Sequence, residues 1–366
     1  LVASLLPASD SSVDIGSNGV RFANGYFDTL YGDGSNLTGV TSVTINSNAD
    51  NRVITGSGSA NTLNGESSLL FDGSMLTVNG IRVGKGANSV AGNTVLGENA
   101  LDASVSGGDN TAIGINTLTA LTSGEGNVAV GHDSLKGLTT GSRNVAIGTL
   151  ALDAVTTASN LTAVGTSALT SNTSGTGNVA VGYNALDANT TGSTNTAVGT
   201  NSLSTNTTGI NNTAVGNSAL ELTTANNNTA VGKDALEANT SGAQSVAVGS
   251  QALTAATTAN NNTAVGMNAA LSTTTGDENV AMGTASLNDN TTGSHNVAIG
   301  RDALRGNTTA SNNTAVGHDS LRSNTTGTRN SALGASALRD NVTGNDNTAV
   351  GYFSLLSNTG TRNTMV

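Results

Sequence analysis

The sequence contains no cysteine, no tryptophan and a single proline, Pro7. The lack of cysteine excludes disulfides, Cys-based zinc sites and thiol nucleophiles, so the residues give no indication of a redox compartment. Aromatic residues make up only 2% of the 366 residues, too few for the hydrophobic cores of two or three globular domains. Charged residues are also scarce, at 10%, which argues against a charge-repelled disordered coil.

Long hydrophobic runs are missing too. No apolar segment approaches the ~20 residues that a membrane helix needs, and the residues after Leu1 show no signal-peptide pattern. The formal net charge of −11 has the wrong sign for binding nucleic acid or an anionic membrane surface. The chain begins at Leu1 rather than at methionine, so we expect it to be part of a longer protein.

What the chain does contain is a repeat rich in Asn, Thr, Ser, Ala and Gly. From residue 93 onward the motif Asn-Thr/Val-Ala-Val/Ile-Gly recurs, and fourteen of the fifteen intervals between its sixteen glycines are 17 residues long. The remaining interval is 16 residues. These glycines define position 0 of each repeat and are Gly97, Gly114, Gly131, Gly148, Gly165, Gly182, Gly199, Gly216, Gly232, Gly249, Gly266, Gly283, Gly300, Gly317, Gly334 and Gly351.

Each position of the repeat, numbered from this glycine, has its own chemistry. Position −1 is always aliphatic, position −2 is Ala in fifteen of sixteen repeats, and position −4 is Asn in fourteen, including Asn110, Asn195 and Asn296. Position +4 is Leu in fifteen repeats, as at Leu118 and Leu203. A polar stretch, often Asn-Thr-Thr-Gly, fills the positions between this Leu and the next Asn.

The pattern predicts an all-β fold, a parallel β-solenoid or β-roll with one repeat per coil and sixteen coils. Short β-branched runs flanked by glycine are typical of strands, so one strand is expected before the glycine and a second around position +4. Asn-Thr-Thr-Gly is expected to turn the chain, with its glycine at positive φ. Identical positions stacked ~4.8 Å apart would join the Asn side chains in hydrogen-bonded ladders.

The same pattern predicts an oligomer. Strand alternation places the Ala at −2 on one face and positions −3 and −1 on the other. About three apolar side chains per coil are too few to offset the backbone entropy that a lone chain loses. The uniform face of small Ala side chains therefore predicts the close approach of other chains around a shared axis, and we expect a homotrimer.

The repeat resembles a known family. Asn195-Thr-Ala-Val-Gly199 and Asn296-Val-Ala-Ile-Gly300 resemble the head repeats of trimeric autotransporter adhesins. The resemblance implies a left-handed parallel β-roll with three chains in each rod. The repeat of those adhesins is usually shorter, so the longer polar turn in this chain is a departure from their pattern.

The N-terminal part of the chain contains phrases such as Leu6-Pro-Ala-Ser-Asp10 and Arg21-Phe-Ala-Asn-Gly25. They resemble segments of a second family, the tail fibres of bacteriophages, in particular those of marine and cyanobacterial phages. Such fibres often carry a C-terminal intramolecular chaperone, which trimerises the chain and then cleaves itself off. The sequence shows no such domain, so we expect the natural protein to continue beyond Val366. The phrases that carry this resemblance are Leu6-Pro-Ala-Ser-Asp10, Val13-Asp-Ile-Gly16, Arg21-Phe-Ala-Asn-Gly25, Gly32-Asp-Gly-Ser-Asn-Leu-Thr-Gly39, Asp50-Asn-Arg-Val-Ile-Thr-Gly56 and Leu70-Phe-Asp-Gly-Ser-Met-Leu-Thr-Val78.

The sequence divides the chain into three expected regions. Residues 1–40 are expected to form a hydrophobic plug that caps the open end of the solenoid, or an attachment surface toward a tail adaptor. Residues 41–92 form a β-rich connecting region, and residues 93–366 form the repeat shaft. The N-terminal segment holds four of the eight aromatic residues, Phe22, Tyr26, Phe27 and Tyr31. The strands expected in the connecting region are 53–55, 69–71, 76–78 and 81–83, and a β-prism of intertwined strands is one arrangement they allow.

Several short motifs suggest chemistry. The triplets His132-Asp133-Ser134 and His318-Asp319-Ser320 contain the residue types of a hydrolase triad, but a triad is assembled by spatial geometry, not by sequence neighbours. Gly84 to Ser89 lacks the Walker pattern, and Ser106 to Asp109 lacks the periodic Asp of calcium-binding repeats. Asn-x-Thr triplets match glycosylation sequons, yet their fixed register favours a role in turns and ladders. We predict no catalytic residue, no cofactor and no metal.

Positions +1 and +2 vary from coil to coil and are expected on the outer surface. Tyr183, Tyr352 and Phe353 are the candidates there for contact with a glycan or a protein. A flat Thr array like that of ice-binding solenoids is an alternative use of the coils, but position −3 is Thr in only nine of sixteen repeats.

The sequence therefore predicts a structural, non-enzymatic protein, the rigid trimeric shaft of a phage tail fibre that acts in host-cell attachment. The expected partners are two further copies of the chain, a tail adaptor, baseplate or preceding fibre protein, and a host-surface glycan or protein. Neither nucleic-acid binding nor membrane insertion is expected. The alternatives are the stalk or head of a bacterial surface adhesin, and a self-assembling extracellular filament.

Overall fold

The computed structural model describes residues 52–56, 63–71 and 75–366. Throughout these residues the fold is all-β, without a helix. The first four strands are β1 (Arg52–Gly56), β2 (Leu63–Phe71), β3 (Met75–Val78) and β4 (Ile81–Gly84), and they confirm the four strands expected in the connecting region. The predicted N-terminal cap, with Phe22, Tyr26, Phe27 and Tyr31, lies outside the described residues.

The strands that precede the repeats are antiparallel. β2 pairs with β3, β3 with β4, and β4 with β5 (Thr94–Gly97), which is the first strand of the repeat region. Asn79 and Gly80 join β3 to β4 with φ values of 48° and 83°, the geometry of a type I′ hairpin turn. The sheet is therefore continuous from the hairpin into the first coil.

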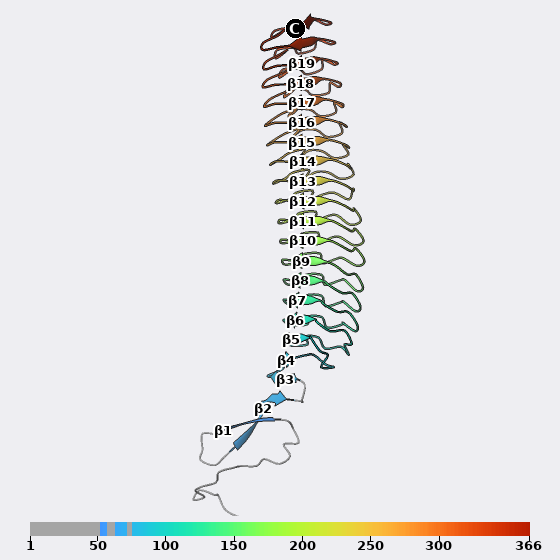
Figure 1. Ribbon diagram of the computed structural model, residues 1–366, viewed down its shortest axis with the longest axis vertical. Coiled ribbons are helices and arrows are strands. Elements are labelled where there is room, and N and C mark those ends of the chain that lie inside the picture. Colours follow the sequence, from blue (N-terminus) through green and yellow to red (C-terminus); the bar gives the residue numbers. More distant parts are fainter. Residues whose placement is uncertain (1–51, 57–62, 72–74) are drawn as a thin grey trace, which may run out of the picture. The chain divides into compact units, whose positions relative to one another are not determined.

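From β5 onward every strand pairs in parallel with the next one, and equivalent residues of successive repeats lie opposite each other, as with Ala180 and Ala197. The predicted solenoid of sixteen coils is confirmed, and Figure 1 shows its strands stacked one above another. The remaining strands are β6 (Thr111–Ile113), β7 (Val128–Val130), β8 (Val145–Ile147), β9 (Thr162–Val164), β10 (Val179–Val181), β11 (Thr196–Val198), β12 (Thr213–Val215), β13 (Thr229–Val231), β14 (Val246–Val248), β15 (Thr263–Val265), β16 (Val280–Met282), β17 (Val297–Ile299), β18 (Thr314–Val316), β19 (Ser331–Leu333), β20 (Thr348–Val350) and β21 (Thr364–Met365).

The core of the solenoid lies inside each coil of the single chain. The Ala at −2, the small residue at +3 and the Leu at +4 are fully buried there, as Ala197, Ser202 and Leu203 illustrate. The prediction that the Ala face meets another chain is therefore wrong. Ala is required because the interior of the coil is narrow, and the side chains at −3 and −1 point outward instead.

The second predicted strand, around Leu118 and Leu203, is also absent. Both leucines lie in turns with φ near +50°, in the left-handed region that costs a residue with a Cβ about 1–2 kcal/mol. Complete burial of a Leu side chain contributes about 2 kcal/mol, which offsets this cost. The chain thus turns sharply at +4 so that the Leu side chain can fill the coil interior.

The glycines serve two different purposes. Gly199, at position 0, has a φ of 139°, and a Cβ there would lie 2.6 Å from the carbonyl carbon of Gly216 in the next coil. Gly209, in the Asn-Thr-Thr-Gly turn, was expected at positive φ but does not adopt it. A Cβ on Gly209 would instead overlap the carbonyl oxygen of Ala225, so that glycine is explained by close stacking.

The predicted Asn ladder is confirmed at position −4. Asn127 donates from Nδ2 to Asn110 Oδ1 at 3.0 Å, and its own Oδ1 accepts from the backbone N–H of Asn144 at 3.0 Å. A second ladder runs at position +7, where Asn206 Nδ2 donates to Asn189 Oδ1 at 3.2 Å. Both ladders are buried, so each coil is held to the next by polar side chains inside the core as well as by strand pairing.

Candidate interaction surfaces

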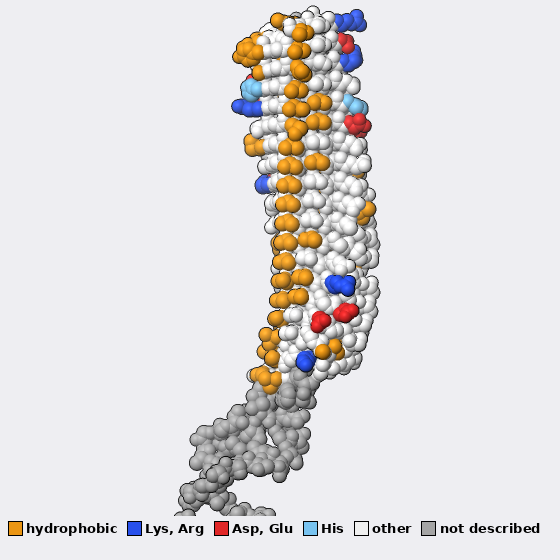
Figure 2. Space-filling view, viewed as in Figure 1, with side chains coloured by type: hydrophobic (Ala, Val, Ile, Leu, Met, Phe, Trp, Pro, Cys, Tyr) orange, Lys and Arg blue, Asp and Glu red, His pale blue; other side chains and the backbone are white. Residues whose placement is uncertain are grey.

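The outward face of the strands forms an apolar band, called here the strand stripe and consisting of positions −3 and −1 from β5 to β20. Seven of the sixteen aliphatic side chains at −1 are exposed, for example Ile147 at 40% and Leu333 at 46%, and the other nine are half-buried. Figure 2 shows them as a nearly continuous column of hydrophobic side chains along the coils. Sixteen coils at ~4.8 Å make the stripe roughly 75 Å long, and three residues make it ~10 Å wide.

A band of this kind is unusual on a protein surface. Soluble monomers rarely expose contiguous apolar patches above a few hundred Å², and larger ones usually mark interaction sites. The stripe covers roughly 750 Å² by its length and width. Threonine hydroxyls interrupt the −3 column, but every −1 side chain is aliphatic. The strand stripe is therefore the strongest candidate for an interaction surface in the described part of the chain.

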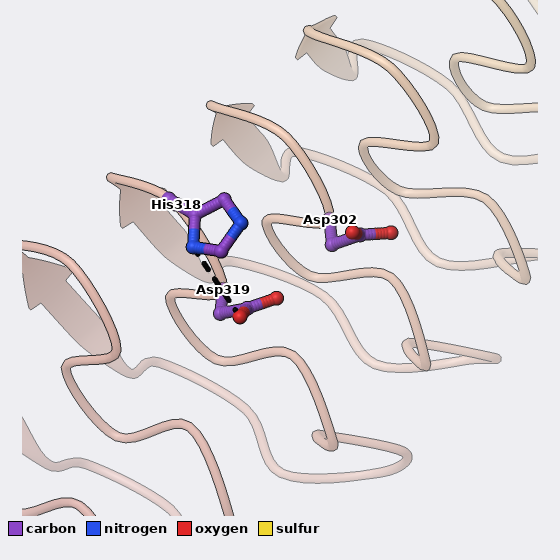
Figure 3. Close-up of side chains that lie close together, drawn as sticks. All are labelled: Asp302, His318 and Asp319. Atoms are coloured by element: carbon purple, nitrogen blue, oxygen red, sulfur yellow. Dashed lines mark ion pairs between the residues drawn. The ribbon is translucent and has the colours of Figure 1, made fainter.

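A second feature is a group of ionisable side chains on two adjacent coils. The ligating atoms of Asp302, His318 and Asp319 lie within 4.8 Å of one another, and His318 Nδ1 is 3.3 Å from Asp319 Oδ2, as Figure 3 shows. Asp302 is buried and already accepts from Arg301 Nε at 3.1 Å and from Arg305 Nη1 at 3.3 Å.

The charges around this group favour ion pairing over metal binding. Arg322 Nε lies 3.7 Å from Asp319 Oδ1, so three guanidinium groups accompany the two carboxylates. A cation would have to displace these partners and would be repelled by their charge. The geometry therefore assigns no metal to Asp302, His318 and Asp319.

The two triplets with triad residue types are not arranged for catalysis. Ser134 and Ser320 are fully buried in the coil interior, and Ser320 Oγ donates to the carbonyl of Gly317 at 2.9 Å. His132 and His318 lie on the outer surface beside their neighbouring Asp residues. A hydroxyl on the inner side of the coil cannot reach a substrate in solvent, so these serines cannot serve as nucleophiles.

The other motifs fit the coil as structural elements. Asn206, the first residue of an Asn-Thr-Thr sequon, is buried in the +7 ladder and out of reach of a glycosylating enzyme. Gly84 is the last residue of β4 and is followed by turns, not by the helix that a phosphate loop requires. Asp109 belongs to no group of three metal-ligating side chains within the described residues.

The variable positions divide into two kinds. Tyr183 and Tyr352 at +1 are exposed, as predicted, and the rings of Tyr352 and Phe353 lie 3.9 Å apart between their centroids. Position +2 is constrained by the backbone, because its residue has positive φ in every coil. The residue is buried in some coils, as at Asp302 and Ser336. The frequent Asn and Asp at +2 are a signal for this left-handed turn that could have been found in the sequence.

The chain matches no protein-family model and no curated protein sequence. None of the described residues belongs to a helix with the length and hydropathy of a membrane span.

Proposed function

We propose that this chain is a rigid shaft segment of a homotrimeric phage tail fibre that takes part in attachment to a host cell. The strand stripe carries the proposal, because its aliphatic column at −1 runs along the coils and is left partly exposed by the single chain. Its occupants are two further copies of the chain. A threefold axis parallel to the stack of strands brings three stripes together, so that each contacts both neighbours.

The size of the stripe supports this assembly. Stable interfaces bury about 800 Å² of accessible surface on each partner, and the stripe offers a footprint of roughly 750 Å² that includes the Thr and Ser side chains at −3. The aliphatic column at −1 would form the dry centre of the contact, and Thr methyl groups and Val side chains at −3 would form its edge. The trimer expected from the sequence is thus retained as a proposal, with a different face at its centre.

The role in attachment follows from the resemblance of the N-terminal phrases to phage tail fibres. A long shaft holds binding sites away from the virion, and three chains present three copies of each surface side chain. Weak contacts with a host-surface glycan or protein then add through their effective concentration. The proposal assigns the shaft no catalysis and places it in the virion tail, joined to a tail adaptor, baseplate or preceding fibre protein.

The coil motif also resembles adhesin heads, so a bacterial surface adhesin is the second candidate. Neighbouring genes for tail proteins would favour the phage fibre, whereas a C-terminal membrane-anchor segment encoded in the complete gene would favour the adhesin. A purified trimer that binds no cells or glycans would favour a self-assembling extracellular filament instead.

The trimer is tested by light scattering on the purified chain. The proposal expects three times the chain mass of 35.8 kDa, and a folded monomer would refute it. The double variant Val198→Glu with Val215→Glu places charges in the stripe and should give monomers. The matched double variant Thr200→Glu with Asn217→Glu adds the same charge at exposed +1 positions and should leave the trimer intact.

A further inference from the structure

The coils toward the C-terminal end of the solenoid carry a charge opposite to that of the rest of the chain. Residues 301–362 contain six of the 13 Lys and Arg residues but only four of the 24 Asp and Glu residues. The remaining sequence holds seven bases and 20 acids. These coils are therefore basic within an acidic chain.

Three of these basic residues lie in one line along the solenoid. Arg305, Arg322 and Arg339 occupy position +5 of three successive coils and are called here the arginine column. The backbone carbonyls of Arg322 and Arg339 accept from the preceding coil at 2.8 and 2.9 Å, which confirms that the three positions are stacked. Successive guanidinium groups therefore start from backbones ~4.8 Å apart.

The acids paired with Arg305 and Arg322 lie deeper than these arginines, whereas Arg339 and its partner Asp340 have similar side-chain exposures of 36% and 38%. Asp302 and Asp319 have side-chain exposures of 7% and 15%, against 44% for Arg322 and 68% for the flanking Arg301. Arg339 donates from Nε and Nη2 to Asp340 at 2.9 and 3.1 Å. Asp302 and Asp319 thus hold the guanidinium groups of Arg305 and Arg322 at their base, and each arginine of the column keeps N–H donors without a partner among the described residues.

Aromatic side chains continue the same surface. Position +1 carries Arg301, then His318 one coil later and Tyr352 three coils after Arg301, and Tyr352 packs against Phe353. Backbone hydrogen bonds link this column from coil to coil, for example from the N–H of Phe353 to the carbonyl of Ala335 at 3.1 Å. Arg301 at +1 and Arg305 at +5 both pair with Asp302 at +2, so positions +1, +2 and +5 share one side of the coils. The exposed aromatic pair at +1 and +2 therefore offers an apolar platform on the side that carries the arginine column.

We propose that the arginine column and the Tyr352–Phe353 pair bind an acidic polysaccharide that carries carboxylate groups and lies along the solenoid. The carboxylates pair with guanidinium groups, and the apolar face of a sugar ring packs on the aromatic pair. A glycan fits better than single-stranded nucleic acid, because one aromatic pair offers a platform for a single sugar ring and not the series of stacking positions on which successive bases bind. The inference deepens the proposed function, since it rests on host attachment and names the class of glycan.

The test measures binding of the intact purified chain to polygalacturonate, by biolayer interferometry at low and at moderate salt. Binding to the wild type is expected at low salt and should weaken with added salt, because exposed ion pairs are screened. A neutral glucan and single-stranded DNA serve as the comparison ligands. Absence of binding to polygalacturonate, or tighter binding to DNA or to the glucan, would overturn the proposal.

Two matched triple variants locate the site. Replacement of Arg305, Arg322 and Arg339 by Gln should weaken polygalacturonate binding about tenfold, since three exposed pairs are lost. Replacement of Arg143, Arg329 and Arg362 by Gln removes the same charge from another side of the coil and should change the affinity less than about twofold. Equal losses in both variants would contradict the assignment and indicate a response to net charge alone.

Folding and assembly are checked separately on each variant. The circular dichroism spectrum and the mass from light scattering of each variant should match those of the wild type. If the Gln variant fails to fold, the corresponding Arg→Lys triple variant replaces it, because it keeps the charge. That Lys variant should still bind less tightly, because Lys cannot form bidentate pairs with a carboxylate. A trimer that binds no polygalacturonate refutes this inference alone, whereas a folded monomer that binds it refutes the trimeric fibre alone.

Discussion

Replacement of Asn127 by Ala tests whether the buried Asn ladder holds successive coils together. The Asn127 side chain donates to Asn110 Oδ1 and to the carbonyl of Gly141, both at 3.0 Å. Its Oδ1 accepts from the backbone N–H of Asn144 at 3.0 Å and from Asn144 Nδ2 at 3.1 Å. The Ala variant leaves the Gly141 carbonyl and the Asn144 N–H buried without these partners.

The expected loss is about 2–6 kcal/mol, because each buried backbone group left unpaired costs about 1–3 kcal/mol. A coil of a solenoid contacts only its neighbours, so the loss should remain local. Hydrogen-exchange mass spectrometry should show exchange at least about tenfold faster in peptides around Asn144, with no change in the coils beyond Gly249.

Two further variants complete this experiment. Ser123→Ala alters an exposed side chain near the same coil and should leave exchange unchanged. Asn127→Leu imitates the natural Leu161, which is fully buried at position −4 two coils later, so it should destabilise less than Ala. Exchange in Asn127→Ala that matches the wild type would refute the view that the ladder stabilises the stack.

Two further predictions concern glycine and charge. Gly199→Ala should lower the melting temperature more than Gly209→Ala does, and thermal unfolding compares the two. A Cβ on Gly199 would meet the backbone of the next coil at a positive φ, whereas Gly209 has no positive φ and Ala occupies its equivalent position in other coils, so there only the contact with Ala225 has to be relieved. Burial raises the pKa of the Asp187 carboxyl above its ordinary value of 3.8, so the folded state holds this proton more tightly than the unfolded state does. Asp187→Asn should therefore raise the free energy of unfolding at neutral pH, with a gain that shrinks as the pH falls and is lost below pH 3.8. Urea unfolding at pH 7 and pH 3 measures the effect, and Glu125→Gln, at an exposed position, should show none.

The strand face shows why the sequence could predict a contact between chains and still assign that contact to the wrong face of the strand. Alternation correctly separated Ala197 from its neighbours Thr196 and Val198. It could not decide which face is inside, because a three-residue strand with Ala on one side and Val on the other allows both arrangements. The choice depends on the width of the coil interior, which is set by turns that include a left-handed Leu203.

The sequence by itself determined the period, the parallel in-register stacking, the Asn ladder at −4 and the exposure of position +1. These features recur from coil to coil, so the sequence contains many instances of each of them. Only the tertiary structure decided that the Ala and Leu side chains share one interior, that position +4 is a turn, and that Gly209 stacks closely on the next coil without a positive φ. It also placed Arg305 and Arg322 above recessed carboxylates and paired Arg339 with Asp340, which is about as exposed as the arginine. These outcomes depend on how the chain packs within a coil and on how closely one coil packs on the next, and no local pattern of residues encodes that packing.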